Sequence, residues 1–401
     1  MTSTRTDRRI LVTLPDVAWP VDGGKRLRCN GVLRGLAAAG QVDVAFLFST
    51  APGGVPPVPP DVPVHEWRRI SPPSRGRLPG AVLSAVRGVP AHVGAQRWDS
   101  VREQLADWTR QPYDLVWFGG LDHARGLRDV LHAPHRVVDC DDVETEKWRA
   151  FLAGGSGLSV ERVQRRVELG MWQRIQRDVA GWADAVAVCS ELDAQRFGTG
   201  PTVVVPNTYP EPAGPVDLGG ALRHPDAPVL LMIANWGTDQ NVDAARYAAH
   251  EVLPAVRALL PAARLRLAGR LPERIAEVAG VPGVDVVGAV DDVAAELAAA
   301  DVVVVPMRFG GGTRLKVLEA FAHGTPVVST TLGAEGLSAV DGEQLLVRDR
   351  PEEFARAVQQ VVTDPALRAR LVTAGAALHR AAFRPQVAVD TVTALVDRLL
   401  A

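Results

Sequence analysis

The sequence predicts an α/β protein made of two doubly wound domains, each a parallel sheet covered by helices. Candidate strands and helices alternate along nearly all of the 401 residues, which is typical of parallel sheets with helical crossovers. Residues 206–228 are rich in Pro and Gly and have no periodicity, so they divide the alternation in two. We expect domains over residues 1–205 and 206–385, and a final helix over 386–401 that packs back on the first domain.

In the first domain, "RRILVTL" predicts the first strand and "KRLRCNGVLRGLAAAG" a helix that ends at Gly40. "QVDVAFLFS" predicts the second strand, and a Pro-rich loop follows at residues 51–60. Later strands are predicted at "YDLVWFGG", "HRVVDC", "ADAVAVCS" and "PTVVVPN". A long helix is expected at "SVERVQRRVELGMWQRIQRDVAGW".

The second domain repeats the pattern. "PVLLMIAN" predicts a buried strand and "NVDAARYAAHEVLPAVRALL" an amphipathic helix. Further strands are predicted at "ARLRLAG", "VDVVG", "DVVVVP", "TPVVST" and "QLLVR", and residues 351–401 are expected to be mostly helical. Ligands of doubly wound sheets lie beyond the carboxyl ends of the strands, so we expect the two domains to face one interdomain cleft.

Composition excludes several classes of protein. The formal net charge of −2 gives no electrostatic reason to expect a nucleic-acid partner. Cys29, Cys140 and Cys189 are far apart and odd in number, which disfavours a disulfide framework and a structural zinc site. The first 20 residues contain no signal-peptide core, and no run of 18 apolar residues follows. A cytoplasmic location is therefore expected.

The stretch "RFGGGTRLKVLEAFAHGTPVVST" predicts a glycine turn between a strand and a helix. The strand "DVVVVP" precedes it, and apolar residues at i, i+3 and i+7 give the helix one buried face. Gly324 is placed to end the helix in a left-handed conformation, and Pro326 prevents its continuation. Gly310, Gly311 and Gly312 therefore lead from the carboxyl end of a strand into a helix N-terminus.

Such a turn is suited to an anion. Free backbone N–H groups and the helix dipole favour a phosphate there, and glycines remove the Cβ atoms that would keep it away. Arg314 and Lys316 add positive charge for a diphosphate, and Glu319, on one stripe with Lys316 and His323, is placed to accept hydrogen bonds from a ribose diol. The alternative is a solvated helix with a Lys316–Glu319 pair that contributes about 0.2–0.5 kcal/mol.

The segment "GGGTRLKVLEAFAHGTPVVSTTLGAEGL" resembles the donor-binding segment of family-4 glycosyltransferases, which have the GT-B fold of two Rossmann-like domains and retain the anomeric configuration. The family pattern has two glutamates eight positions apart. The second falls on Glu319, which implies a contact with the donor ribose. The first falls on Gly311, so the glutamate that touches the donor sugar is missing. The Gly-Gly-Gly-Thr-Arg-Leu-Lys form resembles a recurring sub-branch.

The resemblance covers most of the chain, including "PVDGGKRLR", "VVDCDDVETEKW", "VVVPNTYP" and the segment that begins "MIANWGTDQN". It implies a retaining glycosyltransferase that moves a sugar from a nucleoside diphosphate, UDP or GDP, to a hydroxyl group. The acceptor is left open between a glycan, a lipid-linked intermediate and a natural product. No metal ion or other cofactor is implied, because cations and N–H groups would stabilise the leaving diphosphate.

The expected site residues follow strands or begin helices. Arg314, Lys316 and His123 are expected at the reaction centre, and Lys25, Asp142 and Glu144 at the acceptor. The expected donor and nucleotide contacts are Gly23, Gly24, Asn235, Gly237, Arg270, Gly310, Gly311, Gly312, Thr313, Glu319 and Glu335. Alternatives stay open: Arg270 and Lys25 as solvated cations, Trp236 as a packing residue, and Asp142 and Glu144 as caps of a helix that starts near Val143.

Three other functions are considered. A nucleotide-sugar epimerase would keep the fold and change the reaction. A non-catalytic nucleotide-sugar binder or scaffold would explain the missing first glutamate. A dehydrogenase is disfavoured, because the first strand is not followed by a GxGxxG turn. Peripheral contact with an anionic membrane is also considered, because two stretches, "SRGRLPGAVLSAVRG" and "ERVQRRVELGMWQRIQR", are basic. It is not favoured, because arginine is this chain's default polar residue.

Overall fold

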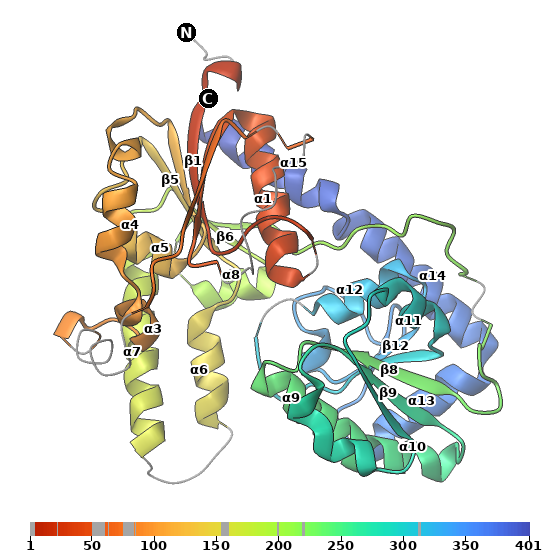
Figure 1. Cartoon of the computed structure of the whole chain (residues 1–401). Coiled ribbons are helices and arrows are strands. Elements are labelled where there is room, and N and C mark those ends of the chain that lie inside the picture. Colours follow the sequence, from red (N-terminus) through yellow and green to blue (C-terminus); the bar gives the residue numbers. More distant parts are fainter. Residues whose placement is uncertain are drawn as a thin grey trace. The chain divides into compact units, whose positions relative to one another are not determined.

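The computed structural model describes residues 5–21, 23–49, 61–62, 64–74, 84, 86–153, 160–198, 200–218, 221–311 and 314–401. The chain forms two compact units, one of Met1–Thr208 with Pro385–Ala401 and one of Tyr209–Arg384. In each unit helices cover a parallel sheet (Figure 1). The predicted doubly wound α/β class is confirmed for both units.

The first unit contains a seven-stranded sheet of order β3-β2-β1-β4-β5-β6-β7. Its strands are β1 (Arg9–Leu14), β2 (Gln41–Leu47), β3 (Glu66–Ile70), β4 (Leu115–Phe118), β5 (His135–Cys140), β6 (Ala185–Val188) and β7 (Thr202–Val204). All pairs are parallel, and Val12 of β1 lies opposite Val44 of β2 and Trp117 of β4. The strand order reverses between β1 and β4, which is where doubly wound sheets bind ligands.

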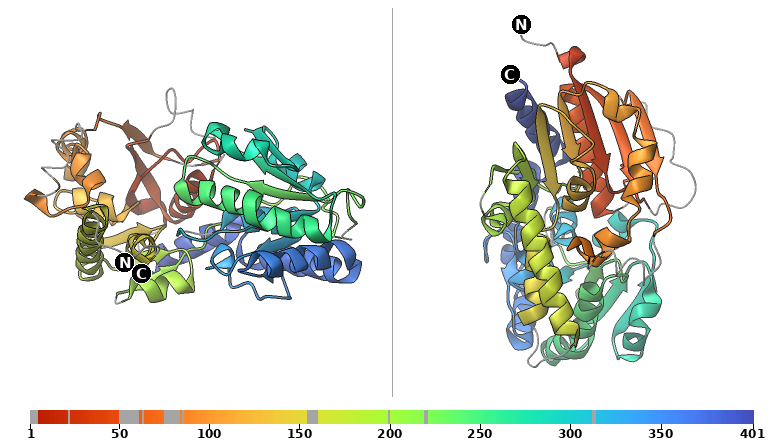
Figure 2. Two further views of the ribbon diagram at one scale, coloured as in Figure 1. Left: turned by 90° about the horizontal axis from the view of Figure 1, so that it is seen from below. Right: turned by 90° about the vertical axis from the view of Figure 1, so that its left-hand side faces the viewer.

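Helices cover both faces of this sheet (Figures 1 and 2). One face packs against α1 (Gly24–Ala39) and α15 (Pro385–Leu399), which share a core. The other packs against α3 (Ala91–Ala95), α4 (Trp98–Gln104), α5 (Leu121–Leu127) and α7 (Val160–Ala180). The remaining elements are η1 (Arg5–Asp7), η2 (Trp108–Arg110), α8 (Glu191–Phe197) and α6 (Glu144–Ala153), which lies beside α7. The last helix thus belongs to the first unit, and Thr393 Oγ1 donates to the Gly35 carbonyl at 3.0 Å.

The second unit contains a six-stranded sheet of order β10-β9-β8-β11-β12-β13. Its strands are β8 (Val229–Ile233), β9 (Arg264–Ala268), β10 (Val284–Gly288), β11 (Val302–Val305), β12 (Val327–Ser329) and β13 (Leu346–Val347). Its helices are α9 (Asp239–Tyr247), η3 (Ala248–Val252), α10 (Leu253–Leu259), η4 (Pro272–Gly280), α11 (Val293–Ala299), α12 (Leu315–Ala322), η5 (Leu332–Ala334), α13 (Pro351–Thr363) and α14 (Pro365–Ala382). Here the strand order reverses between β8 and β11.

Two helix predictions concern the second unit. The expected end of α12 is confirmed, because Gly324 follows the helix with a left-handed φ of +68°. The helix expected at residues 241–260 is present as the continuous run of α9, η3 and α10, in which η3 is a π-helical turn. The turn ends two residues before Pro254, which has no N–H to donate, and a wider turn accommodates that missing hydrogen bond.

The Pro- and Gly-rich segment that separates the two predicted domains is hydrogen-bonded to the second unit along much of its length. The buried carboxylate of Asp301 accepts hydrogen bonds from the backbone N–H groups of Arg223, His224 and Val229 at 2.6, 3.1 and 2.8 Å. Nearer its start, the Tyr209 N–H donates to the Phe383 carbonyl at 2.9 Å. The absence of sequence periodicity therefore corresponds to irregular backbone that is hydrogen-bonded to the second unit.

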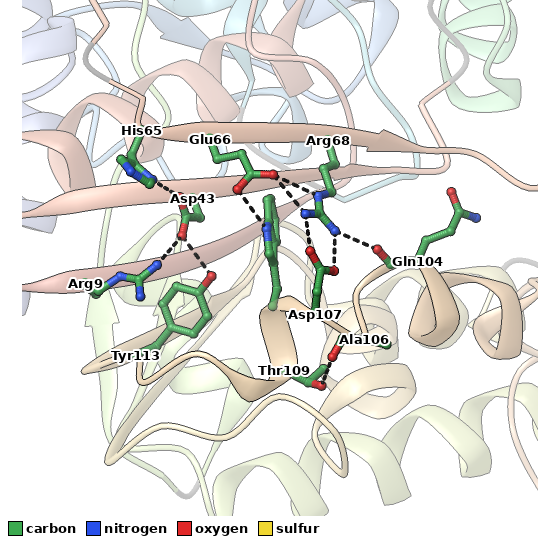
Figure 3. Close-up of polar contacts among 11 residues, drawn as sticks. Arg9, Asp43, His65, Glu66, Arg68, Gln104, Ala106, Asp107, Thr109 and Tyr113 are labelled. Atoms are coloured by element: carbon green, nitrogen blue, oxygen red, sulfur yellow. Dashed lines mark hydrogen bonds and ion pairs between the residues drawn. The ribbon is translucent and has the colours of Figure 1, made fainter.

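A polar cluster joins β1, β2 and the segment before β4 (Figure 3). Asp43, only 3% exposed, accepts hydrogen bonds from Arg9 Nη2 at 3.1 Å and from Tyr113 Oη at 2.9 Å, and His65 Nδ1 lies 2.7 Å from its other oxygen. A buried carboxylate is stable only when it is paired and hydrogen-bonded, so these partners allow it to remain in the sheet. Burial, with Asp43 adjacent, raises the pKa of Tyr113 and keeps its hydroxyl a donor.

Replacing Tyr113 by phenylalanine is expected to destabilise the first unit by about 1.5–3 kcal/mol, because a buried carboxylate loses a donor. Tyr247→Phe is the matched control, since its hydroxyl donates to a neutral acceptor, the Asp349 carbonyl, at 3.1 Å. That change should lower stability by about 0.5–1.5 kcal/mol. Denaturant unfolding measures both, and equal losses would contradict the assignment of Asp43 as a buried charge.

Candidate functional site

The glycine turn lies between β11 and α12, as the sequence predicts. Gly310 has a φ of +119°, and a Cβ there would come within 3.0 Å of the Gln240 side chain on α9. Only glycine fits this position without strain. Gly312 and Thr313 lie outside the described residues, and α12 begins at Leu315, one residue after the buried Arg314.

Arg314 holds the turn from inside. It is 6% exposed, and its guanidinium donates to the carbonyls of Leu332 at 2.9 Å, Gly311 at 2.6 Å and Gly310 at 3.1 Å. These bonds turn the carbonyl oxygens of the loop toward the cation. Arg314 therefore shapes the turn and adds positive charge behind it, and its predicted contact with a diphosphate remains a prediction.

Lys316 and Glu319 lie on α12, three residues apart and partly exposed. Desolvation, with a smaller effect of Arg314, lowers the pKa of Lys316 to about 8, against the opposing effect of Glu319. Desolvation also raises the pKa of Glu319 to about 7, and Lys316 opposes this rise. Two oppositely charged groups whose pKa values approach neutrality are typical of functional sites. The simple solvated pair considered from the sequence does not account for these environments.

Lys316 is held by a residue that sequence reasoning missed. Its Nζ donates to Asn241 Oδ1 on α9 at 2.8 Å, and Asn241 Nδ2 donates to the Asn235 carbonyl at 2.8 Å. Asn235 Oδ1 in turn accepts from the Gly237 N–H at 3.0 Å. The structure therefore joins Lys316 to Asn235 and Gly237, two expected nucleotide contacts that follow β8. The only sequence signal was the place of Asn241 in the first turn of a helix after that strand.

The other expected donor residues lie on neighbouring loops of the second unit. Trp236 is fully buried, so its alternative reading as a packing residue is correct. Arg270 follows β9 and is exposed, and its carbonyl accepts from the Trp236 N–H at 3.1 Å. Glu335 follows η5 and is partly exposed. These positions fit the expected site without establishing a ligand contact.

A pocket of about 530 Å³ lies in the first unit, at its point of strand-order reversal. It is lined by residues that follow β1, β4 and β5, and by the start of α1. Gly23 precedes α1 and Gly24 begins it, and the exposed Lys25 lines the pocket. The acceptor candidates Asp142 and Glu144 also line it, and Glu144 is the first residue of α6.

His123 lines the same pocket and lies in the first turn of α5. It is 1% exposed, and its Nδ1 lies 3.0 Å from Thr13 Oγ1 at the end of β1. Burial lowers the pKa of His123, Lys25 adds to this, and Asp122 opposes it. A neutral imidazole with one nitrogen fixed by Thr13 suits hydrogen bonding to a hydroxyl group better than charge pairing.

A buried ion pair supports the floor of the pocket. Arg28 on α1 donates to Asp139 at the end of β5 at 3.0 Å, and also to Asn207 Oδ1 at 3.0 Å. Burial opposes the charge of Arg28, and Asp139 more than offsets this, so the pKa of Arg28 lies well above its ordinary value. Asn207 Nδ2 donates to Asp141 Oδ1 at 2.8 Å. The pair fixes the acidic segment that carries Asp142 and Glu144.

The sequence predicts neither a metal site nor a membrane-spanning helix. Among the described residues, no group of three or more His, Cys, Asp or Glu side chains could hold a metal ion. Within the same part of the chain, no helix is long and apolar enough to cross a membrane. Most of the first basic stretch, "SRGRLPGAVLSAVRG", lies outside the described residues, and the second lies on α7.

The fold and these sites define a two-unit α/β protein whose polar loops gather at the carboxyl ends of both sheets. Comparison with known proteins agrees with this class. Residues 227–364 match the family model described as "Glycosyl transferases group 1". Within the curated proteins, the lipopolysaccharide core biosynthesis glycosyltransferase LpsE of Rhizobium meliloti (strain 1021) is 37% identical over 158 residues, which cover 37% of this chain and 44% of that protein.

Solved structures are similar over almost the whole chain. Sucrose-phosphate synthase from Thermosynechococcus elongatus superposes with a TM-score of 0.68 at 20% identity and covers 98% of this chain and 99% of its own. The Anabaena protein HepE in complex with UDP and glucose gives a TM-score of 0.62 at 15% identity, with 97% of this chain and 98% of that chain covered. At these identities the likeness concerns the fold, and the expected GT-B fold of two parallel-sheet α/β domains is confirmed.

Proposed function

We propose that this protein is a retaining glycosyltransferase of the family-4 type. It transfers a sugar from a nucleoside diphosphate to a hydroxyl group without a metal ion. The observation that carries the proposal is the β11–α12 site, where Gly310, Lys316 and Glu319 combine a glycine turn, a cation and a desolvated carboxylate. The family match over residues 227–364, which contain this segment, supports the assignment. UDP and GDP are the proposed nucleotides, and HepE has been solved with UDP.

Each end of the donor has a proposed partner. The diphosphate lies at the N-terminus of α12, where backbone N–H groups, the helix dipole and the Lys316 ammonium stabilise its negative charge. The ribose diol donates to Glu319. Gly23, Gly24, Asn235, Gly237, Arg270, Glu335 and the unplaced Gly312 and Thr313 are proposed to surround the donor.

The acceptor is proposed to occupy the pocket of the first unit. Asp142, Glu144 and Lys25 line that pocket and present charged groups to acceptor hydroxyls. His123 offers a neutral imidazole to a hydroxyl of the acceptor or of the sugar. The proposed acceptor is a glycan, a lipid-linked intermediate or a natural product.

The proposed reaction is a front-face transfer. The bond between the anomeric carbon and the diphosphate oxygen breaks, and the acceptor oxygen bonds to the same face of that carbon. The acceptor proton passes to a departing phosphate oxygen. Lys316 and the turn contribute by stabilising the charge that develops on the leaving diphosphate.

The test is incubation with UDP- and GDP-sugars, with and without a panel of glycan, lipid-linked and small-molecule acceptors. A transferase releases the nucleoside diphosphate faster with an acceptor and forms a glycoside with the donor's anomeric configuration. An epimerase changes the sugar in the absence of any acceptor. A non-catalytic binder is stabilised by a nucleotide, by about 2.7 kcal/mol at 100 times the Kd, but consumes no donor.

The affinity for a nucleoside diphosphate is expected to fall as the pH rises above about 8. Lys316 has a pKa lowered to about 8, so the free protein loses this cation in that range, while the diphosphate stays fully ionised. Isothermal titration calorimetry between pH 7 and 10 measures the effect. Lys316→Arg should abolish the decrease, because arginine keeps its charge throughout. An affinity independent of pH in the wild-type protein would contradict a role for the Lys316 cation.

A further inference from the structure

Asn241 is a buried polar residue whose side-chain amide is bonded at both ends. It is 7% exposed and lies on α9, which begins two residues earlier. Its oxygen accepts from Lys316 Nζ, and its nitrogen donates to the Asn235 carbonyl, both at 2.8 Å. An ammonium group only donates and a carbonyl only accepts, so the chemistry of the two partners fixes which end of the amide faces Lys316.

The acceptor that holds Lys316 is therefore neutral. A carboxylate at this position would hold the ammonium as well, but it would cancel its charge. An amide oxygen fixes the direction of the side chain and leaves a net positive charge for an anion. The acidic residues near Asn241 on α9 have other partners, since Asp239 pairs with Arg274 and Asp243 with Arg308, each at 2.7 Å or less.

The backbone segment that anchors Asn241 is itself held by hydrogen bonds. Asn235 closes a local turn by accepting from the Gly237 N–H, and the next carbonyl, that of Trp236, accepts from Arg274 Nη1 at 3.1 Å. The side chain of the neighbouring Gln240 lies beside Gly310, where it would be 3.0 Å from a Cβ atom on that residue. The start of α9 thus supports both the cation of α12 and the turn that precedes it.

We propose that Asn241 is a positioning residue that holds the Lys316 ammonium toward the diphosphate of the donor through a neutral oxygen, without adding a negative charge beside it. This inference rests on the proposed function for the identity of the anion. Asn241 itself need not touch the nucleotide. A purely structural role would require only that the space be filled and the Asn235 carbonyl satisfied.

Among the described residues, the side chains that act on Lys316 come from the α12 segment and from α9. Arg314 and Glu319 lie on its own segment, and α9 presents the neutral Asn241. Asn241→Asp places a second carboxylate beside Nζ, so the pKa of Lys316 should rise above its lowered value of about 8. Asn241→Leu fills the space without an acceptor and should leave that pKa at or below its wild-type value.

The chain has only three lysines, Lys25, Lys147 and Lys316, so carbon-13 labelling of the lysine Cε atoms gives a three-signal NMR spectrum. Lys316→Arg assigns one signal by its loss. A pH titration of the ligand-free protein should then show an upward shift of the Lys316 midpoint by at least about one pH unit in Asn241→Asp. Gln360→Glu also replaces an amide by a carboxylate, at an exposed residue of α13, and is the matched control. This change should leave the Lys316 midpoint where it is in the wild type.

Calorimetry with UDP and GDP completes the test. At pH 7, Asn241→Asp and Asn241→Leu should each weaken binding by about tenfold or more, as expected for a lost or neutralised charged hydrogen bond. In Asn241→Asp the decrease in affinity with pH should also begin at a higher pH. An unmoved Lys316 midpoint, or wild-type affinity in both variants, overturns the inference. A wild-type protein that binds neither nucleotide overturns the proposed function instead, while the lysine titration still reports on the contact with Asn241.

Discussion

Replacing Lys316 by methionine is expected to lower the rate of sugar transfer by about 10²–10³-fold. Methionine keeps most of the length and apolar volume of the side chain, so the change removes mainly the charge. That charge acts on the departing diphosphate, and removing one preorganised group that stabilises developing charge has an effect of this size. Transfer from a UDP- or GDP-sugar, measured at saturating donor, checks the prediction.

The same change should not destabilise the protein at pH 7. Desolvation lowers the pKa of Lys316 to about 8, below its ordinary value of 10.5, so the folded protein disfavours the charged form. The resulting stability deficit is present below pH 8 and diminishes as the pH rises toward the unfolded-state value. Lys316→Met removes the desolvated charge, which offsets the loss of the hydrogen bond to Asn241 Oδ1, so the thermal unfolding midpoint should stay close to that of the wild type.

Arg308→Met is the matched control, because it removes a cation from the loop that precedes α12. Arg308 is exposed and pairs with Asp243 at 2.6 Å. The Arg308→Met variant should lose at most about 1 kcal/mol of stability. Its rate of sugar transfer should stay within a few fold of the wild-type rate. Equal losses of transfer in the two variants would show that the effect is general electrostatics and not the specific position of Lys316.

Replacing Asp139 by alanine is expected to destabilise the first unit by about 3–5 kcal/mol. The change removes the carboxylate that is hydrogen-bonded to the buried Arg28 guanidinium, and a poorly compensated buried charge is strongly unfavourable. Arg28 would keep its bonds to the neutral Asn207 and Val205 carbonyl at 2.9 Å, and the accessible carboxylate of Asp141, 3.8 Å from Nε, would compensate its charge only in part. Urea unfolding of the variant and the wild type gives the difference in free energy.

An exposed ion pair provides the comparison. Asp285 pairs with Arg264 at 2.6 Å across neighbouring strands, and both side chains are accessible to solvent. Asp285→Ala should lower stability by at most about 1 kcal/mol. If Asp139→Ala loses no more than this control, Arg28 must reach water, and the description of the pocket floor as a buried ion pair is wrong.

Much of the fold could be predicted because hydrophobic runs and glycine signals are local. "DVVVVP", the turn at Gly310 and the end of α12 at Gly324 depend on residues that are adjacent in sequence. The strand β3 was missed, because "EWRRI" is polar at an edge of the sheet and lacks a buried run. The anchoring of residues 223–229 was also missed, since it depends on Asp301, far along the chain.

In the candidate site, too, contacts between residues close in sequence could be predicted and contacts between distant residues could not. Lys316 and Glu319 could be predicted from one helical stripe, whereas the partner of Lys316, Asn241, lies 75 residues away. The pairing of Arg28 with Asp139 spans 111 residues, and an arginine on the apolar face of α1 was its only signal. The sequence pattern did not predict α5, which begins directly after the glycines that follow β4 and carries His123 in its first turn.

The most direct measurement is a crystal structure of the protein with UDP or GDP bound. The account predicts the paired phosphates at the N-terminus of α12, within hydrogen-bonding distance of Lys316 Nζ, with the ribose hydroxyls on Glu319. A nucleotide bound at another place, with the turn at Gly310 unoccupied and Glu319 in solvent, would contradict the central claim.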